Sequence, residues 1–221
     1  LGEQTSVTTA AGSTLTLNAA ADISLGANAL ILSSGNLIDV NSTISGTGGV
    51  TVKGTGTVRF DAAQTYTGGT TIADSATLSA ELILTSTMAG NVVVSTGGTL
   101  RGTGTIAGNV DVVEDIDPGD TGTVLLTING NLTFSSVVTT DAAIFDLRGI
   151  TAATSYDQLR VGGTVTANTA KITLVPNQAF PVGTVFVLID KTSPGAISNN
   201  PVFLYADGTT IAEGSVKVVG V

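Results

Sequence analysis

The sequence of 221 residues contains no cysteine, no histidine and no tryptophan, and charged residues make up only 11% of it. The absence of cysteine excludes disulfides, iron–sulfur clusters and thiolate zinc sites. The absence of histidine excludes Ser-His-Asp and Cys-His catalysis and every metal site that needs an imidazole. The net charge is −9, with 8 Lys and Arg against 17 Asp and Glu. We therefore expect no nucleic-acid partner, because such binding needs a basic surface.

Long apolar runs are also missing. No run reaches the 18 residues of a membrane-spanning helix, and no basic segment precedes an apolar stretch as in a signal peptide. We expect that any such peptide has been removed. The abundance of Thr, Ser, Asn and Gly, together with few lysines and no cysteine, is typical of a secreted bacterial surface protein. The sequence therefore predicts a cell-surface or extracellular location.

Apolar residues alternate with Thr, Ser or charged residues along most of the chain, as at 14–18, 49–53 and 57–61. A period of two residues places all apolar side chains on one face of a strand. β-Branched residues are abundant and favour strands. No stretch of ten or more residues has convincing helical periodicity, so the sequence predicts a nearly all-β protein.

The strands are short and closely spaced, with centres near 16, 24, 31, 39, 44, 51, 59, 71, 78 and 83. Three such strands in each coil give a repeat of about 20 residues, which is the length expected of a solenoid. Related Gly-rich segments at 46–52, 54–58 and 102–110 support this interpretation. We expect a parallel β-solenoid in which each strand pairs with its equivalents one coil away around stacked Leu, Ile and Val.

The character of the sequence changes near residue 114, where an acidic segment is followed by most of the aromatic residues. Residues 1–113 are predicted to form the β-helix coils. Residues 114–221 are predicted to form either a wider continuation or a β-sandwich-like cap. The strands expected there are longer, at 123–129, 131–138, 142–148, 157–161, 164–167, 171–175, 184–190, 202–205, 209–211 and 215–220.

One family is suggested by four segments that occur in order between about 55 and 175. The segment Gln64-Thr65-Tyr66-Thr67-Gly68-Gly69-Thr70-Thr71-Ile72 resembles the Asn-Thr-Tyr-Thr-Gly-Gly-Thr-Thr-Ile repeat of bacterial autotransporter passenger domains, with Gln64 in place of Asn. Residues 98–106, 118–134 and 156–163 are similar to the Gly-rich segments that follow in that family. The resemblance implies a right-handed parallel β-helix that is exported and displayed at the cell surface. It implies no particular activity, because such passengers include adhesins, enzymes and stalks.

Acidic residues gather in the turn predicted at 114–120. Glu114, Asp115, Asp117 and Asp120 supply hard oxygen ligands of the kind that Ca²⁺ prefers, so this turn is a candidate calcium site. The alternative is a solvated loop built on the turn chemistry of Pro118 and Gly119.

Catalysis is the weaker prediction. Basic residues are scattered along the chain, and the pairs Arg59–Asp61 and Arg148–Asp146 are expected to be surface ion pairs. We expect no enzyme and name no catalytic residue. The alternative function is a carbohydrate-binding or polysaccharide-cleaving β-helix module with surface glycans as partners.

The two ends of the sequence carry apolar strands without charged or proline guards. Either the chain is a piece of a longer parent chain, or its ends pair with neighbours by head-to-tail stacking or strand addition. The self-association residues would be Val7, Leu15, Val216, Val218, Val219 and Val221. The sequence thus favours a structural protein, an adhesin-like stalk or a self-assembling fibre subunit.

Overall fold

A computed structural model describes residues 3–18, 22–72, 80–119, 124–135, 142–181, 183–199, 201–205 and 207. Within these residues the protein is all-β, without a helix, and every pair of named strands is parallel. The prediction of an all-β, parallel-strand protein is therefore confirmed. No helix of this part of the chain is long and apolar enough to cross a membrane.

The strands form four sheets, of which A, B and D are long and C has two strands. Sheet A contains β1 (Thr5–Thr8), β4 (Leu30–Ser34), β7 (Val50–Gly54), β9 (Thr70–Ile72), β12 (Val92–Val94), β15 (Val110–Val112), β18 (Leu132–Phe134) and β21 (Val165–Thr166). Sheet B contains β2 (Thr14–Leu17), β5 (Leu37–Val40), β8 (Thr57–Phe60), β10 (Ala80–Leu84), β13 (Gly98–Gly102), β16 (Asp115–Pro118), β19 (Ala143–Leu147), β22 (Lys171–Pro176) and β24 (Val202–Tyr205). Sheet D contains β11 (Thr87–Met88), β14 (Thr105–Ile106), β17 (Leu125–Ile128), β20 (Gln158–Val161) and β23 (Ile189–Lys191), and sheet C contains β3 (Ile23–Ser24) and β6 (Ile44–Ser45).

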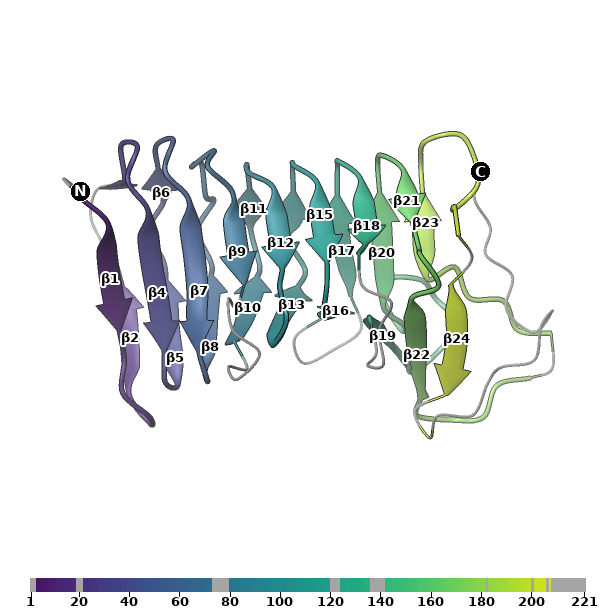
Figure 1. The fold of residues 1–221 in the computed structure, drawn as a ribbon. Helices are drawn as coiled ribbons and strands as arrows, with labels where there is room; N and C mark the ends of the chain where they lie inside the picture. The colour runs from purple at the N-terminus through teal and green to yellow at the C-terminus, as the bar shows by residue number, and fades with distance from the viewer. Residues whose placement is uncertain are drawn as a thin grey trace.

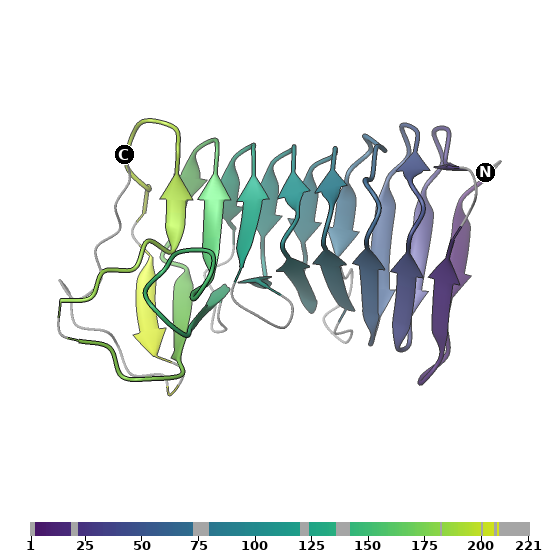
Figure 2. The ribbon, with the colours of Figure 1, turned by 180° about the vertical axis from the view of Figure 1, so that it is seen from behind.

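Each sheet takes one strand from each successive coil of the chain, which gives the elongated shape in Figures 1 and 2. Val50, for example, pairs with Leu30 of the preceding coil and Thr70 of the following one. The arrangement is compatible with the predicted solenoid, because every strand pairs with its equivalents in the neighbouring coils.

Inward-facing side chains form columns that run along the length of the molecule. One column on sheet A passes from Val7 through the fully or almost fully buried Leu32, Val52, Ile72, Val94, Val112 and Phe134, each paired in register with the next. Burial of such side chains contributes about 1.5–3 kcal/mol for each Val, Leu or Phe. The alternation seen in the sequence is thus the inward and outward alternation of these strands.

Gln64 joins sheets C and D into one face. Its side chain is buried, and it accepts a hydrogen bond from Ile44 N at 2.8 Å and donates to Ala62 O and Ser42 O at 2.7 and 3.2 Å. Its backbone N–H donates to the carbonyl oxygen of Thr87, the first residue of β11, at 2.8 Å. In the coil that contains Gln64, no named strand lies on this face between β6 and β11. The hydrogen bonds of Gln64 hold the chain in place there instead.

Asparagines form a ladder at the corner between sheets D and A. Asn109 N donates to Asn91 Oδ1, Asn131 N to Asn109 Oδ1, and Thr164 N to Asn131 Oδ1, each at 2.8 Å. A glycine precedes each of these four residues, and a Cβ on Gly108 would lie 2.6 Å from Gly90 O. The corner therefore needs glycine for close stacking and asparagine for a side-chain acceptor that reaches the next coil.

All three long sheets run across residue 113, since β15 pairs with β18, β13 with β16, and β14 with β17. The described strands beyond 113 thus continue the same sheets, in line with the first of the two alternatives for 114–221. Strand length beyond residue 113 varies: β22 has six residues, more than any other named strand, whereas β18 and β21 have only three and two and are shorter than the strands predicted at 131–138 and 164–167. The strands expected at 209–211 and 215–220 lie outside the described residues.

Candidate functional site

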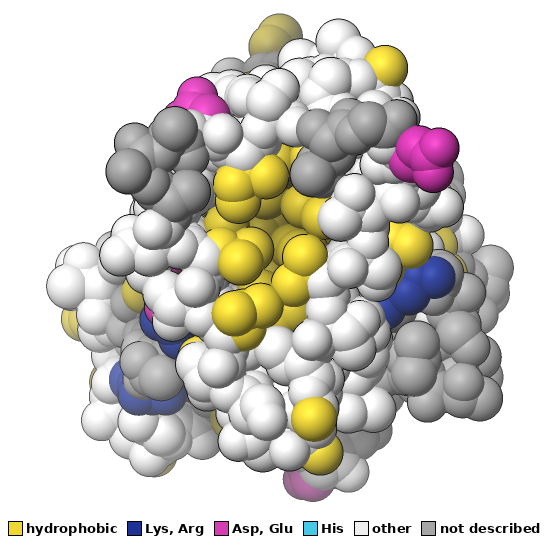
Figure 3. All heavy atoms as spheres, turned by 90° about the vertical axis from the view of Figure 1, so that its left-hand side faces the viewer, with side chains coloured by type: hydrophobic (Ala, Val, Ile, Leu, Met, Phe, Trp, Pro, Cys, Tyr) yellow, Lys and Arg dark blue, Asp and Glu magenta, His cyan; other side chains and the backbone are white. Residues whose placement is uncertain are grey.

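The end of the molecule at β1, β2 and β3 presents apolar side chains to solvent. Figure 3 looks along the long axis at this end and shows an apolar patch near its centre, bordered mainly by backbone and non-hydrophobic side chains. We define the end face as Val7 on β1, Leu15 and Leu17 on β2, and Ile23 on β3. All four are only partly buried.

Each residue of the end face terminates an inward column. Val7 pairs in register with Leu32, Leu15 with Ile38, Leu17 with Val40, and Ile23 with Ile44. These four partners are 0% exposed, so one further coil suffices to bury an inward side chain completely. Strands β1, β2 and β3 also stand at the ends of their sheets, and among the described residues no further strand pairs with them. Free strand edges beside apolar side chains form a template for pairing with another chain.

Two of the six predicted self-association residues, Val7 and Leu15, therefore come together on one surface. Leu17 and Ile23 complete that surface, and the sequence reasoning missed them because it did not identify which strand positions share an end. Val216, Val218, Val219 and Val221 lie outside the described residues.

The acidic segment 114–120 is mainly a strand, so the prediction of a turn there is wrong for β16 (Asp115–Pro118). Ile116 and Pro118 are buried, whereas Asp115 and Asp117 lie on the opposite, outer face of sheet B, and Glu114 lies in the bend before the strand. The alternation of these residues follows the period of a strand. Asp120 lies outside the described residues. In the described part of the chain, no group of three or more acidic side chains could hold a metal ion, so the calcium site remains a prediction.

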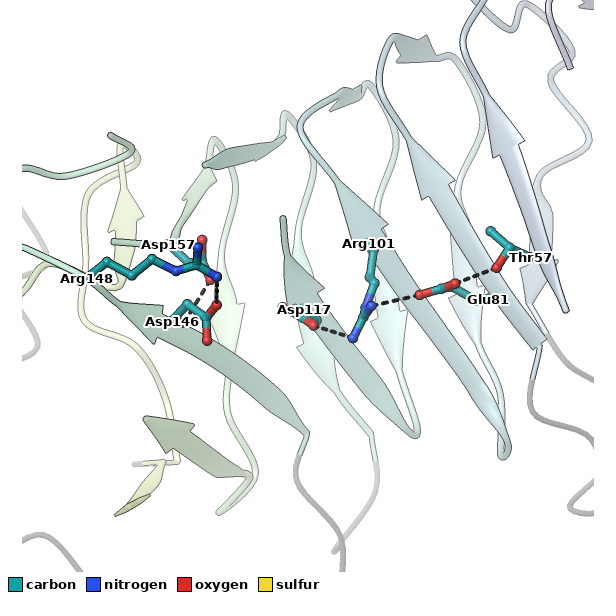
Figure 4. Close-up of polar contacts among 7 residues, drawn as sticks. All are labelled: Thr57, Glu81, Arg101, Asp117, Asp146, Arg148 and Asp157. Carbon is teal, nitrogen blue, oxygen red and sulfur yellow. Dashed lines mark hydrogen bonds and ion pairs between the residues drawn. The ribbon is translucent and has the colours of Figure 1, made fainter. Parts of the chain in front are cut away.

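Charged side chains of neighbouring strands form a row on the outer face of sheet B (Figure 4). Arg101 on β13 lies between Glu81 on β10 and Asp117 on β16, with N–O distances of 3.0 and 2.8 Å. Glu81 also accepts a 2.6 Å hydrogen bond from Thr57 on β8. Cross-strand charge pairs of this kind contribute about 0.2–1 kcal/mol each. The row links four successive strands of one sheet.

Asp117 differs electrostatically from an ordinary surface carboxylate. Burial raises its pKa to about 6, although the positive charge of Arg101 acts in the opposite direction and Asp146 adds a smaller repulsion. The Nε atom of Arg101 is buried and has no hydrogen-bond partner within the described residues. Asp117 therefore titrates in a range in which exposed aspartates are already ionised.

Next to this row lies a second group of charges, Asp146, Arg148 and Asp157 (Figure 4). Arg148 donates to Asp146 at 2.7 Å, which confirms the ion pair predicted from their spacing. Asp157 accepts backbone hydrogen bonds from Asp146 N at 2.8 Å and Val124 N at 3.0 Å. Asp157 is 1% exposed, and burial raises its pKa to about 7 against the effect of the two N–H donors.

One lysine is buried near the end of sheet D. Lys191 is 1% exposed, and its Nζ donates to the carbonyl oxygens of Ser193, Pro194 and Gly195 at 2.6, 2.9 and 3.0 Å. Three acceptors match the three donors of an ammonium group. This arrangement fixes the segment after β23 and leaves the amine no open side for chemistry.

Several of these residues were missed by sequence reasoning, which treated the basic residues as scattered. Glu81, Arg101 and Asp117 are far apart in sequence but adjacent in sheet B because β10, β13 and β16 are neighbours. The coil length could have revealed this group. An alignment of successive coils of the sequence with one another places Glu81, Arg101 and Asp117 close together on neighbouring strands.

Comparison of the sequence with models of protein families, with curated proteins and with solved structures gives no match. The function of the chain is therefore inferred from its own geometry.

Proposed function

We propose that the chain is a structural segment of an exported, cell-surface or extracellular protein, folded as a right-handed parallel β-helix like the autotransporter passengers that it resembles. Its task is to form a rigid stalk or fibre, and it has no catalytic role. The observation that carries this proposal is the end face, where four inward columns and three strand edges stop together. We propose that a second copy of the chain covers this face and so extends the column.

The physical basis is the repetition of one interaction. Each coil covers the inward side chains of the coil before it. Val52, for example, packs against Leu32 of the preceding coil, and both side chains are fully buried. A partner that presents strands in the same register would bury the end face in the same way. If the covering copy contributes its opposite end, the contact is head-to-tail and does not close, so repeated addition would give an open polymer.

The test is assembly of the purified chain, followed by negative-stain electron microscopy and sedimentation. Leu15→Lys places a charge in the end face, whereas Thr16→Lys places the same charge on the outer face of the same strand, opposite Asp39. We expect fibres from the unaltered chain and from Thr16→Lys, and single particles from Leu15→Lys.

Two results would overturn the proposal. Single particles from the unaltered chain at every concentration would show that a second copy does not cover the end face, and coils of a longer parent chain would then be the alternative. Equal assembly of Leu15→Lys and Thr16→Lys would show that the contact lies elsewhere.

A second candidate function is glycan binding by the outer face of sheet B. The row of Glu81, Arg101 and Asp117 favours it, because partly exposed carboxylates and an arginine can bind sugar hydroxyls and uronic-acid carboxylates. Binding to a panel of acidic and neutral polysaccharides tests this function. Arg101→Ala should abolish such binding, and Arg160→Ala, which removes an arginine paired with Asp190 on sheet D, is the matched control.

A further inference from the structure

The far end of the molecule, opposite the end face, finishes differently in each sheet. Sheet D finishes in β23, where Lys191 pairs in register with Val161 and takes the place of an aliphatic residue in an inward column. Its ammonium group donates to three carbonyl oxygens of the residues that follow, so this column ends in a buried charge. Sheet A finishes in a single bridge between Thr166 and Ser198.

Sheet B, in contrast, finishes in a complete apolar strand, β24 (Val202–Tyr205). Phe203 pairs in register with Ile172 of β22. Tyr205 pairs with Leu174 two residues further on, so both aromatic residues extend inward columns of this sheet. Tyr205 is 42% exposed, whereas Ile172 and Leu174, one strand deeper, are buried. Within the described residues β24 pairs only with β22, so its second edge is a template for a further strand.

Strands β24 and β2 match in length and in phase. Each has four residues, and each turns its second and fourth residues inward: Phe203 and Tyr205 on β24, Leu15 and Leu17 on β2. The two strands lie at opposite ends of the same parallel sheet. A parallel β2 from another copy, placed on β24, would therefore set each leucine on one aromatic ring and continue both columns.

We propose that β24 of one copy is the strand that covers β2 of the next, so that sheet B runs parallel and unbroken through the fibre. This inference rests on the proposed assembly and specifies its contact: Leu15 pairs with Phe203 inside the column, and Thr16 with Leu204 on the outer face. Because β2 and β24 lie at opposite ends of the molecule, the contact is head-to-tail and repeats (Figure 1). The connection between β22 and β23 extends past β24, and the next copy lies beside it (Figure 1).

The chain has no cysteine, so single-cysteine variants report this contact without background. Thr16→Cys and Leu204→Cys place thiols on the outer face of sheet B, one at each end, and the proposed register sets them on adjacent strands about 4.8 Å apart. An equal mixture of the two, treated with a short bismaleimide, should give cross-linked dimers. In the control mixture Asp190→Cys, on the outer face of β23 in sheet D, replaces Leu204→Cys and should give none.

Each variant is also treated alone. Cross-linking of Thr16→Cys by itself would show that two end faces meet each other, and it would overturn this inference. Fibres without a cross-link between Thr16→Cys and Leu204→Cys would also overturn it, while the proposed assembly would stand. Single particles without any cross-link would overturn both.

Substitutions on β24 give a second test. Phe203→Glu places a charge in the inward column, whereas Val202→Glu places the same charge on the outer face, opposite Lys171. Fibres should be lost with Phe203→Glu and kept with Val202→Glu. Equal fibre formation by the two variants would overturn the inference, and the cross-linking result does not depend on whether Phe203→Glu folds.

Discussion

Replacement of Gly102 by alanine tests how closely two neighbouring coils approach. Gly102 ends β13 and pairs in register with Leu84 at the end of β10. Its φ angle is +120°, and an added Cβ would lie 2.0 Å from Leu84 O and 2.7 Å from Leu84 C. The obstructing atoms belong to the backbone, so no side-chain rotation can relieve the contact.

The cost has two parts. The positive φ angle costs an alanine about 1–2 kcal/mol. Relief of the contact also requires movement of the Leu84 carbonyl, which accepts hydrogen bonds from Thr103 N and Gly104 N at 2.9 Å each. Loss of these two bonds costs about 0.5–1.5 kcal/mol each. We therefore expect Gly102→Ala to lower the free energy of unfolding by about 2–5 kcal/mol.

Gly12→Ala is the matched control, because Gly12 also has a positive φ angle, +75°, but an added Cβ would meet no atom within 4 Å. We expect it to lose only the conformational part, about 1–2 kcal/mol. Urea unfolding followed by circular dichroism gives both values through the transition midpoints. If Gly102→Ala and Gly12→Ala unfolded at the same urea concentration, β10 and β13 could not be stacked as described.

Substitutions at three further positions have expected outcomes that urea unfolding can check. Asn109→Ala should cost about 1 kcal/mol because Asn131 N loses its acceptor, whereas Asn109→Asp keeps an acceptor oxygen and should cost less. Lys191→Met should cost about 2–3 kcal/mol, because three carbonyl groups lose an ammonium donor in a buried site. Arg101→Ala should raise the pKa of Asp117 further above about 6, because the positive charge that lowers it is removed. The free energy of unfolding of this variant should therefore fall more steeply between pH 5 and pH 8 than that of the unaltered chain. Parallel pH profiles of the two proteins would contradict this.

The positions of many strands could be predicted because the period-two alternation has a direct structural cause. The centres predicted near 31, 39, 51 and 59 fall within β4, β5, β7 and β8, whose inward residues are the buried ones. Each of these strands pairs with its equivalents one coil away, so local pattern and tertiary environment agree.

The strand predicted at 184–190 shows where this reasoning fails. Only Ile189 and Asp190 of that range belong to a strand, β23. In the apolar run before them, Phe186 packs edge-on against Tyr156 and Phe180, with ring centroids 5.1 and 4.9 Å apart, whereas Val185 is 57% exposed. An apolar run predicts burial, but sequence alone does not distinguish pairing in a sheet from packing in an aromatic cluster.

The candidate site could be predicted only in part, because its members meet through the stacking of coils. Val7 and Leu15 were identified from their place in the sequence, but Leu17 and Ile23 join them only once the register of β2 and β3 is known. Asp157 gave no local signal at all, since its partners Val124 and Asp146 lie in other segments. A buried carboxylate becomes recognisable only when the backbone donors around it are placed.

The end face and Asp157 lie in different parts of the elongated molecule, near β1 and near β19 (Figure 1). Strands here pair only with those of neighbouring coils, so perturbations at the two places should be independent. Leu15→Lys should therefore leave the titration midpoint of Asp157 unchanged, and Asp157→Asn should leave fibre formation unchanged. A shift of either property by the other substitution would mean that assembly reaches the connection between β19 and β20, and the contact between copies would then involve the side of the molecule as well as its end.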